Sequence, residues 1–528
     1  MKRSNQKGAA LIFALIFVLV LSITAASLMF LSQSETWSSL NYRLMTQSRY
    51  GAEAGLHAAA NYLMNNYTQP VAGGVTDPIS AYNLTVSPVT LTAGTSPIAL
   101  GPTMNNVSAN YPVPTVLTGF KSATQKSLTA GNTTVKYSVN AELLSMRSIT
   151  ECQNLQPLTA QLWKLTSHGD IGGVRSAEVE VSALLESHVT PCYNYAGFAT
   201  GTGCGSINFN GGGTINSYDS SNLALSGGNP VTQNYMGNLG SNGNVNTAAN
   251  TVVNGTFSSP DTGVGACSSG GVTALSGNTT SVTGCGTSLT SCVAPPGLVK
   301  MPQALTLVTP QIPTTVPPPS TNLGNSNAPL TLVPCSGICP DNGSGNGNYG
   351  DIGLSGGASN VVTFVPAVVM VNGVSVCQPG TYYVNSISLA GNASIAVGPC
   401  PGTGGNGQPP AQYQPVIINV VGANQATPLD IGGNGISNTT FNSTLLQIQY
   451  AGTGAINLHG NGQSSAVLYA PNAGITFSGN AQWYGSVIGS TIGSNGNASV
   501  SIHYDRALQN NLMTVGNWTL DTFTWSKY

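Results

Sequence analysis

The sequence has very little charge. Only 6% of its 528 residues are Asp, Glu, Lys or Arg, and the net charge is -2, whereas about 25% of residues are charged in ordinary soluble domains. Capture of nucleic acid depends on clustered Lys and Arg that neutralise phosphates. The composition gives no support for such a partner, and we expect no nucleic acid to bind.

Low charge combined with 65 glycines would also suit a disordered chain. Disordered segments, however, are poor in β-branched and apolar residues. Here Val, Ile, Leu and Thr recur in short clusters between Gly-Asn turns. This pattern predicts a folded protein that is mainly β.

The ten cysteines all follow the apolar N-terminal run. Only Cys335 and Cys339 are closely spaced, and a zinc site needs a second short pair or nearby histidines. Residues 341–347 resemble a calcium loop faintly, but they lack Asp or Asn at its third and fifth positions and its closing Glu. We therefore expect structural disulfides formed in an oxidising compartment, and no metal or other cofactor.

The N-terminus combines a basic leader, a single glycine and a long apolar run. Lys2, Arg3 and Lys7 precede Gly8, and residues 9–31 then contain no charge. As a helix these twenty-three residues would be about 35 Å long, enough to cross a hydrocarbon core of about 30 Å.

Three interpretations of this segment compete. The run is too long for the 7–15 apolar residues of a secretory signal peptide, whereas an uncleaved anchor fits its length and charge. In the third interpretation, a cut between Gly8 and Ala9 removes the leader and keeps the whole apolar helix.

The polar continuation of this helix contains Glu35, Arg49 and the element Ala52-Glu53-Ala54-Gly55. Leader, glycine, apolar run and this element, in that order, resemble the N-terminus of PilX-like type IV minor pilins and pseudopilins over roughly residues 1–65. The resemblance implies cleavage after Gly8 by a prepilin peptidase, a helix that serves assembly, and other pilins or pseudopilins as partners. It also implies a single-pass protein of the bacterial inner membrane, with its C-terminal part extracytoplasmic, which then moves to the pilus or cell surface.

One position departs from the major pilins, which carry Glu at the fifth mature residue. Counting from Ala9, that residue here is Phe13, which favours a scarce or terminal subunit. Glu53 lies four residues after Arg49, and we interpret it as half of an ordinary i,i+4 ion pair.

Beyond the helix, alternation at residues 133–139 and 177–184 predicts strands with one solvated face. The sequence suggests these divisions: basic leader 1–8, transmembrane and assembly helix 9–66, pilin-like α+β head 67–190, Gly/Asn/Ser-rich β region 191–292, Pro-rich linker 293–334, β-solenoid-like domain 335–510, and C-terminal tail 511–528.

A repeat runs through the last third of the chain. Gly-Asn pairs recur at residues 391, 433, 460, 479 and 496, and the last four pairs lie 27, 19 and 17 residues apart. Gly and Asn accept the positive φ of tight turns. Spacing near twenty favours a β-solenoid, as in a right-handed parallel β-helix; a sandwich built of hairpins is the alternative.

Residues 365–510, with Val467-Leu468-Tyr469 and Trp483-Tyr484-Gly485, also resemble an uncharacterised bacterial domain found behind PilX-like N-termini. That domain brings no established activity.

The functional prediction is a non-enzymatic, minor pilin-like or pseudopilin-like subunit of a type IV pilus or a related secretion fibre, carrying a large β domain. One alternative is a surface adhesin that binds glycans, or host or abiotic surfaces, with Tyr469, Trp483 and Tyr484 as its candidate ligand surface. Another is a membrane-anchored carbohydrate-active β-helix enzyme using His503 and Asp505; no separate nucleophile accompanies this pair, so we expect no catalysis.

Overall fold

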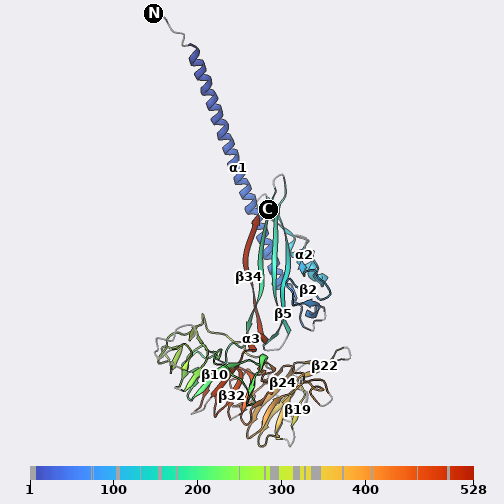
Figure 1. Ribbon diagram of the computed structural model, residues 1–528, viewed down its shortest axis with the longest axis vertical. Helices are drawn as coiled ribbons and strands as arrows, with labels where there is room; N and C mark the ends of the chain where they lie inside the picture. The colour runs from blue at the N-terminus through green and yellow to red at the C-terminus, as the bar shows by residue number, and fades with distance from the viewer. Residues whose placement is uncertain are drawn as a thin grey trace. The chain divides into compact units, whose positions relative to one another are not determined.

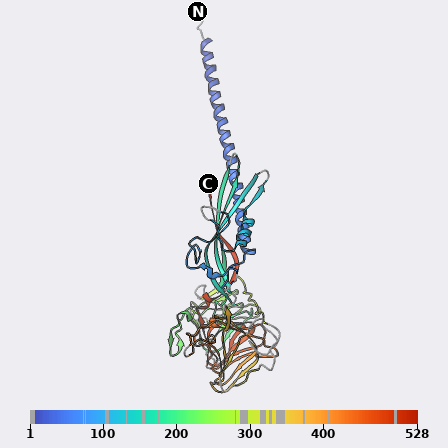
Figure 2. The same cartoon turned by 90° about the vertical axis from the view of Figure 1, so that its right-hand side faces the viewer.

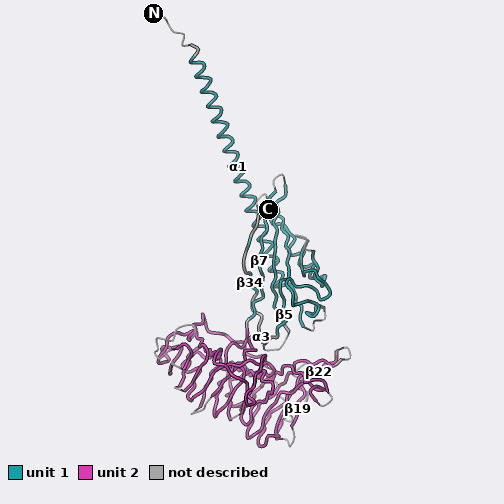
Figure 3. The backbone as a smooth tube through the Cα atoms, in the orientation of Figure 1, with its two compact units in different colours: residues 1–149, 157–190, 515–528 teal, residues 150–156, 191–514 magenta. Residues whose placement is uncertain are grey.

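The computed structural model describes residues 7–527, apart from 73, 75, 103–107, 131–132, 153–156, 174–175, 249, 279–280, 286–296, 313–321, 326–328, 335–346, 372–373, 406–407, 461 and 496–499. The protein is mainly β with one long N-terminal helix, as predicted. It divides into two compact units (Figure 3). Unit 1 comprises residues 1–149, 157–190 and 515–528, and unit 2 comprises residues 150–156 and 191–514.

Unit 1 consists of the helix α1 (Lys7–Asn65) and a mixed sheet. In both views the long strands run alongside the C-terminal half of α1 (Figures 1 and 2). The strand order is β3 (Ala99–Leu100), β5 (Thr133–Glu151), β34 (Leu512–Lys527), β7 (Ala177–Pro191) and β6 (Pro157–Ile171); β4 (Lys126–Ala130) pairs with β5, and β5 also pairs with β6, so the order closes on itself. A short helix, α2 (Pro114–Thr124), and the small hairpin of β1 (Tyr82–Asn83) and β2 (Thr90–Leu91) complete the unit.

The strands of unit 1 are longer than the alternating patterns suggested, with 19 residues in β5 and 15 each in β6 and β7. Their inward side chains bury a core against α1. Leu56 and Leu63 from the helix meet Trp163, Leu165 and Leu185 from the sheet, and each is at most 1% exposed. Burial of such apolar side chains is the main source of folding free energy.

Unit 2 is built from strands (Figure 1) of which most are short, although β31 and β32 have 15 and 13 residues; the pairings in its large sheet are all parallel. The 18-stranded sheet contains β8 (Gly197–Ala199), β9 (Ile207–Phe209), β10 (Gly213–Tyr218), β13 (Leu239–Ser241), β14 (Val245–Thr247), β15 (Thr251–Val253), β16 (Phe257–Ser259), β17 (Leu275–Gly277), β18 (Leu298–Lys300), β20 (Asn348–Leu354), β24 (Gly380–Leu389), β26 (Val416–Val420), β27 (Leu429–Ile431), β29 (Leu446–Tyr450), β30 (Ile456–Leu458), β31 (Gln463–Phe477), β32 (Gln482–Ser494) and β33 (Val500–Asp505). A second parallel sheet contains β19 (Leu330–Leu332), β21 (Val361–Phe364), β25 (Ser394–Val397) and β28 (Ile436–Ser437).

The chain enters and leaves this stack in its middle. Strands β8 and β9 pair on one side with β13 and β14, and on the other with β32. From β10 the chain runs outward to β18, which pairs with β16. It resumes at β20, which pairs with β24, and returns inward to β33 beside β10. The two β regions predicted as separate, 191–292 and 335–510, therefore belong to one stack, because their strands pair with each other.

The predicted C-terminal tail is instead mostly a strand of unit 1. Residues 512–527 form β34, which lies between β5 and β7 in the sheet, and Trp518 and Leu520 pack against the unit 1 core. Unit 2 is thus inserted in the sequence between β7 and β34. At the point of insertion, Cys192 N donates to Leu512 O at 3.2 Å.

The Gly-Asn turns fall where expected, at successive turns of the stack. Gly433 has φ +62° and Gly460 has φ +97°, values that favour glycine. The turns also approach each other closely, since a Cβ on Gly460 would lie 3.1 Å from Gly433 O. The Gly-Asn pair at 496 and most of the Pro-rich run, 313–321, lie outside the described residues.

Candidate functional site

The N-terminal half of α1 is the most distinctive surface of the protein. Every residue from 9 to 39 is exposed, including Leu11 (71%), Phe13 (73%) and Trp37 (60%). Its most apolar 18-residue window has a mean hydropathy of 2.8 and is entirely unburied, so by length and composition the helix could cross a membrane. A soluble chain rarely leaves so large an apolar surface uncovered.

The C-terminal half of α1 packs closely on the unit 1 sheet, and small residues allow this approach. An added Cβ on Gly51 would lie 2.3 Å from Val135 Cγ1, and one on Gly55 would lie 2.5 Å from Ser167 Oγ. Ser48, which is fully buried, donates from its hydroxyl to Gly169 O at 2.5 Å. The sheet therefore fixes the direction of the helix and leaves its first half free.

The predicted processing and assembly residues lie along this helix. Gly8 and Ala9 are in its first turns, Phe13 is in the exposed apolar half, and Glu35 is exposed beyond the apolar run. Arg49 Nε contacts Glu53 Oε1 at 2.8 Å, with the two side chains 48% and 29% exposed. An exposed i,i+4 pair of this kind adds about 0.3–0.5 kcal/mol.

The predicted ligand surface does not form. Tyr469, Trp483 and Tyr484 are 5%, 2% and 2% exposed, so they cannot present stacking faces to a glycan. The hydroxyl of Tyr469 donates to Val308 O at 2.6 Å, and the ring of Tyr484 lies 4.5 Å from that of His503. These side chains pack inside unit 2 because both faces of its strands are covered.

The His503 and Asp505 pair lies on β33, and both residues are buried. Burial lowers the pKa of His503 to about 4, and its Nδ1 lies 2.5 Å from Asn216 Oδ1. Asp505 accepts hydrogen bonds from the backbone N–H of Ser220, Ser443 and Ala507 and from both serine hydroxyls. Burial raises the pKa of Asp505, and these hydrogen bonds oppose that rise. The carboxylate connects three chain segments, which is a structural role.

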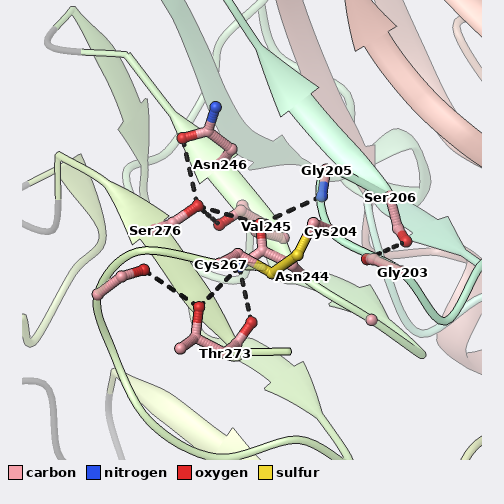
Figure 4. The surroundings of a disulfide bond; sticks show 12 residues. Gly203, Cys204, Gly205, Ser206, Asn244, Val245, Asn246, Cys267, Thr273 and Ser276 are labelled. Carbon is pink, nitrogen blue, oxygen red and sulfur yellow. Dashed lines mark hydrogen bonds between the residues drawn. A yellow bond between two sulfur atoms is a disulfide. The ribbon is translucent and has the colours of Figure 1, made fainter. Parts of the chain in front are cut away.

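The described cysteines are disulfide-bonded, as predicted. The pairs are Cys152–Cys192, Cys204–Cys267 and Cys377–Cys400, and Cys285 is also bonded; Cys292, Cys335, Cys339 and the calcium-like loop at 341 lie outside the described residues. Figure 4 shows Cys204–Cys267, which joins two corners of the stack beside Asn244. The Asn244 side chain accepts from Gly205 N at 3.3 Å and donates to Thr273 O at 2.7 Å. Among the described residues, no group of three His, Cys, Asp or Glu is arranged to hold a metal ion.

A small polar pocket beside Arg506 has no counterpart in the sequence interpretation. Its lining includes Asp219, Asn222, Gln233 and Arg506. The segments that form it are far apart in sequence and meet because β10 pairs with β33. The sequence signal for this pocket was that Asp219 and Arg506 are two of the few charged residues after residue 190.

Comparison with known proteins agrees with the description of α1 as a helix with an exposed apolar half. Residues 7–57 match the family described as PilX N-terminal, and residues 407–511 match a family described as a domain of unknown function (DUF7305). Among solved structures, the competence-associated pilin ComZ from Thermus thermophilus is similar at 13% identity, covering 92% of this chain and 98% of that chain with a TM-score of 0.28. A TM-score this low does not define a common fold. No curated protein matches the chain.

The chain is similar to type IV pilin-like subunits in its N-terminal helix, by the exposed apolar surface of that helix and by the family match over residues 7–57. More particularly, it carries the N-terminus of the PilX-like minor pilins, followed by a C-terminal domain of unknown function. Both resemblances inferred from the sequence are confirmed. The apolar helix and the pilin family fit a membrane-anchored pilin that is then assembled into a pilus.

Proposed function

We propose that this protein is a minor subunit of a type IV pilus or a related secretion fibre, and that it displays unit 2 on the extracytoplasmic side. The observation that carries this proposal is the division of α1 into an uncovered apolar half and a half packed on its own sheet. The uncovered half is then the part that exchanges a lipid environment for contacts with neighbouring subunits. Because lipid tails are as apolar as this surface, close packing against neighbouring helices, and not removal of apolar surface from water, would favour the transfer.

The proposed life cycle begins in the inner membrane, where a prepilin peptidase cuts between Gly8 and Ala9. The new N-terminus then starts the apolar helix, without the basic leader. Phe13 stands where major pilins carry Glu, so this subunit lacks the carboxylate that would pair with a neighbouring N-terminal amine. This lack supports a scarce or terminal position in the fibre.

Unit 2 is proposed to be a β-solenoid. Its parallel pairings support this class over a hairpin sandwich, because hairpins give antiparallel pairs. The stacked glycine turns support it as well, since each turn meets the backbone of a neighbouring one. Such a solenoid presents a long, rigid surface, which suits a displayed domain.

The experiment measures the N-terminus and the location of the exported protein. We expect intact-mass analysis of sheared surface fibres to find this chain beginning at Ala9. The Gly8→Val variant is expected to keep the leader and to be absent from the fibres, whereas Ala26→Val, a matched enlargement inside the apolar run, is expected to behave as wild type. A mature N-terminus other than Ala9, or full incorporation of uncut protein, would refute the processing step. Absence of correctly cut protein from sheared fibres would refute the assembly role.

A further inference from the structure

A loop of unit 2 leaves strand β10 and returns to its end. Ser217 N donates to Gln233 O at 3.1 Å, Gln233 N donates to Ser217 O at 2.7 Å, and the Ser217 hydroxyl donates to Tyr235 O at 2.6 Å. The loop therefore has a fixed base. Between residues 219–233 and Arg506, which follows β33, lies a pocket of about 130 Å³.

Arg506 forms one wall of this pocket, and neighbouring groups hold its guanidinium in place. Its Nη1 donates to Ser217 Oγ at 3.0 Å and to Gln233 Oε1 at 3.1 Å, and the Tyr235 ring lies 4.8 Å from its Cζ. A guanidinium carries five N–H donors. Within the part of the chain that the structure describes, Nε and Nη2 of Arg506 donate no hydrogen bond, although the side chain is only 15% exposed.

Asp219 presents an acceptor next to these donors. Its Oδ1 accepts from Ser221 N at 3.0 Å and from Ser221 Oγ at 2.5 Å. Its Oδ2 lies 3.6 Å from Arg506 Nη2, which is too far for a hydrogen bond. The Ser221 hydrogen bonds, together with the charge of Arg506, lower the pKa of Asp219, so the carboxylate is ionised. The pocket thus offers a donor and an acceptor side by side, with no net charge.

This arrangement selects a hydroxyl-bearing, neutral ligand. A hydroxyl both accepts and donates, so it can accept from Arg506 and donate to Asp219 at once. An anion would face the Asp219 carboxylate, and a cation would face the Arg506 guanidinium. Pro230, Val231 and the residues at 223 and 224 add apolar wall, which suits the C–H face of a sugar ring.

We propose that this pocket binds one neutral sugar unit through its ring hydroxyls. Pockets for drug-sized ligands measure about 300–1,000 Å³, so a pocket of about 130 Å³ accommodates a single ring, such as the end of a glycan. The proposal goes beyond the assembly role and does not depend on it, because the binding is tested on the purified protein rather than on fibres. It places glycan recognition at Asp219 and Arg506, away from the buried aromatic residues.

The test is saturation-transfer NMR on the full-length protein in a zwitterionic, sugar-free detergent. The probes are the methyl glycosides of glucose, galactose and mannose, with glucuronate and acetate as charged comparisons. We expect transfer to at least one neutral glycoside, and at least a five-fold loss in the Asp219→Asn, Arg506→Gln double variant. The matched control is Asp261→Asn, Lys300→Gln, which removes the same two charges elsewhere in unit 2 and is expected to bind as wild type.

The single variant Asp219→Asn guards against a fold defect, because Asn retains an oxygen that can accept from Ser221. This variant is expected to have the melting temperature of the wild type and nevertheless to bind the glycoside more weakly than the wild type does. Three results would overturn the proposal: no transfer to any neutral glycoside, transfer only to glucuronate or acetate, or neutral-glycoside binding that survives the double variant.

Discussion

The two units of the protein both depend on glycine, but for different physical reasons. In unit 1, a Cβ on Gly169 of β6 would lie 2.1 Å from Ser48 O and 2.7 Å from Ala52 N, so this glycine lets the sheet touch the helix backbone. In unit 2, Gly433 has φ +62°, and its Cβ would lie 2.7 Å from Ala393 O. There glycine serves a left-handed turn and its stacking on a neighbouring turn.

The two units are therefore sensitive to substitution at different kinds of position. The helix–sheet contact of unit 1 is a single interface, and moving it changes the direction of α1. The glycine turns of unit 2 recur along its parallel sheet, and each of them meets the backbone of a neighbouring turn. A substitution in the first kind of position should therefore cost more, and over a wider region, than one in the second.

The substitution Gly169→Val should produce the largest effect. The added atoms would overlap the α1 backbone rather than a flexible side chain, and overpacking of this kind costs up to about 3 kcal/mol. Hydrogen exchange measured by mass spectrometry should show faster exchange in residues 48–65 and in β6, with unit 2 unchanged.

Gly172→Val is the matched control, because a Cβ at Gly172 meets nothing within 4 Å. It should leave exchange in α1 as in wild type. Equal protection of α1 in the two variants would contradict the role assigned to the close contact at Gly169.

Gly433→Ala should produce a smaller and more local effect. Alanine in the left-handed region costs about 1–2 kcal/mol, and the close approach to Ala393 O adds to that cost. Faster exchange should be confined to β27, β28 and the adjoining coil. Gly353→Ala, in an open position of β20, is the control and should change little. Spread of the effect through the whole stack would mean that unit 2 opens as one cooperative body.

Local features of the fold were predictable from the sequence. The uncharged run predicted the exposed helix, and the Gly-Asn pairs predicted the turns at 433 and 460. The order of the strands was not predictable, because β10 pairs with β33 across most of the unit and strands of three to six residues carry no record of their partner. The return of β34 into the unit 1 sheet was missed because its partners β5 and β7 lie on the other side of the whole of unit 2 in the sequence.

The candidate site was likewise predictable where its signal is local in the sequence, and not where distant segments meet. The assembly helix was identified because its signal lies in one contiguous stretch. Trp483 and Tyr484 were predicted to form a ligand surface because aromatic rings can offer stacking faces to glycans, a property that the sequence shows without showing whether the rings are exposed. Both are buried, since β32 is covered on both faces. The pocket at Arg506 needs residues from 219–233 and 506 together, which only the folded chain supplies.

The smallest expected effect on stability comes from Glu53→Gln in the packed half of α1. The pair with Arg49 is partly exposed, so its loss should change the free energy of unfolding by at most about 0.5 kcal/mol. Thermal unfolding of Glu53→Gln, Arg49→Gln and the double variant measures this coupling. Recovery in sheared fibres should match wild type in all three if the pair acts only within the helix. If Glu53→Gln alone depleted the protein from fibres while its stability stayed unchanged, the carboxylate would have a partner on another subunit. Unit 1 would then be fixed by contacts inside the chain and also by contacts made during assembly.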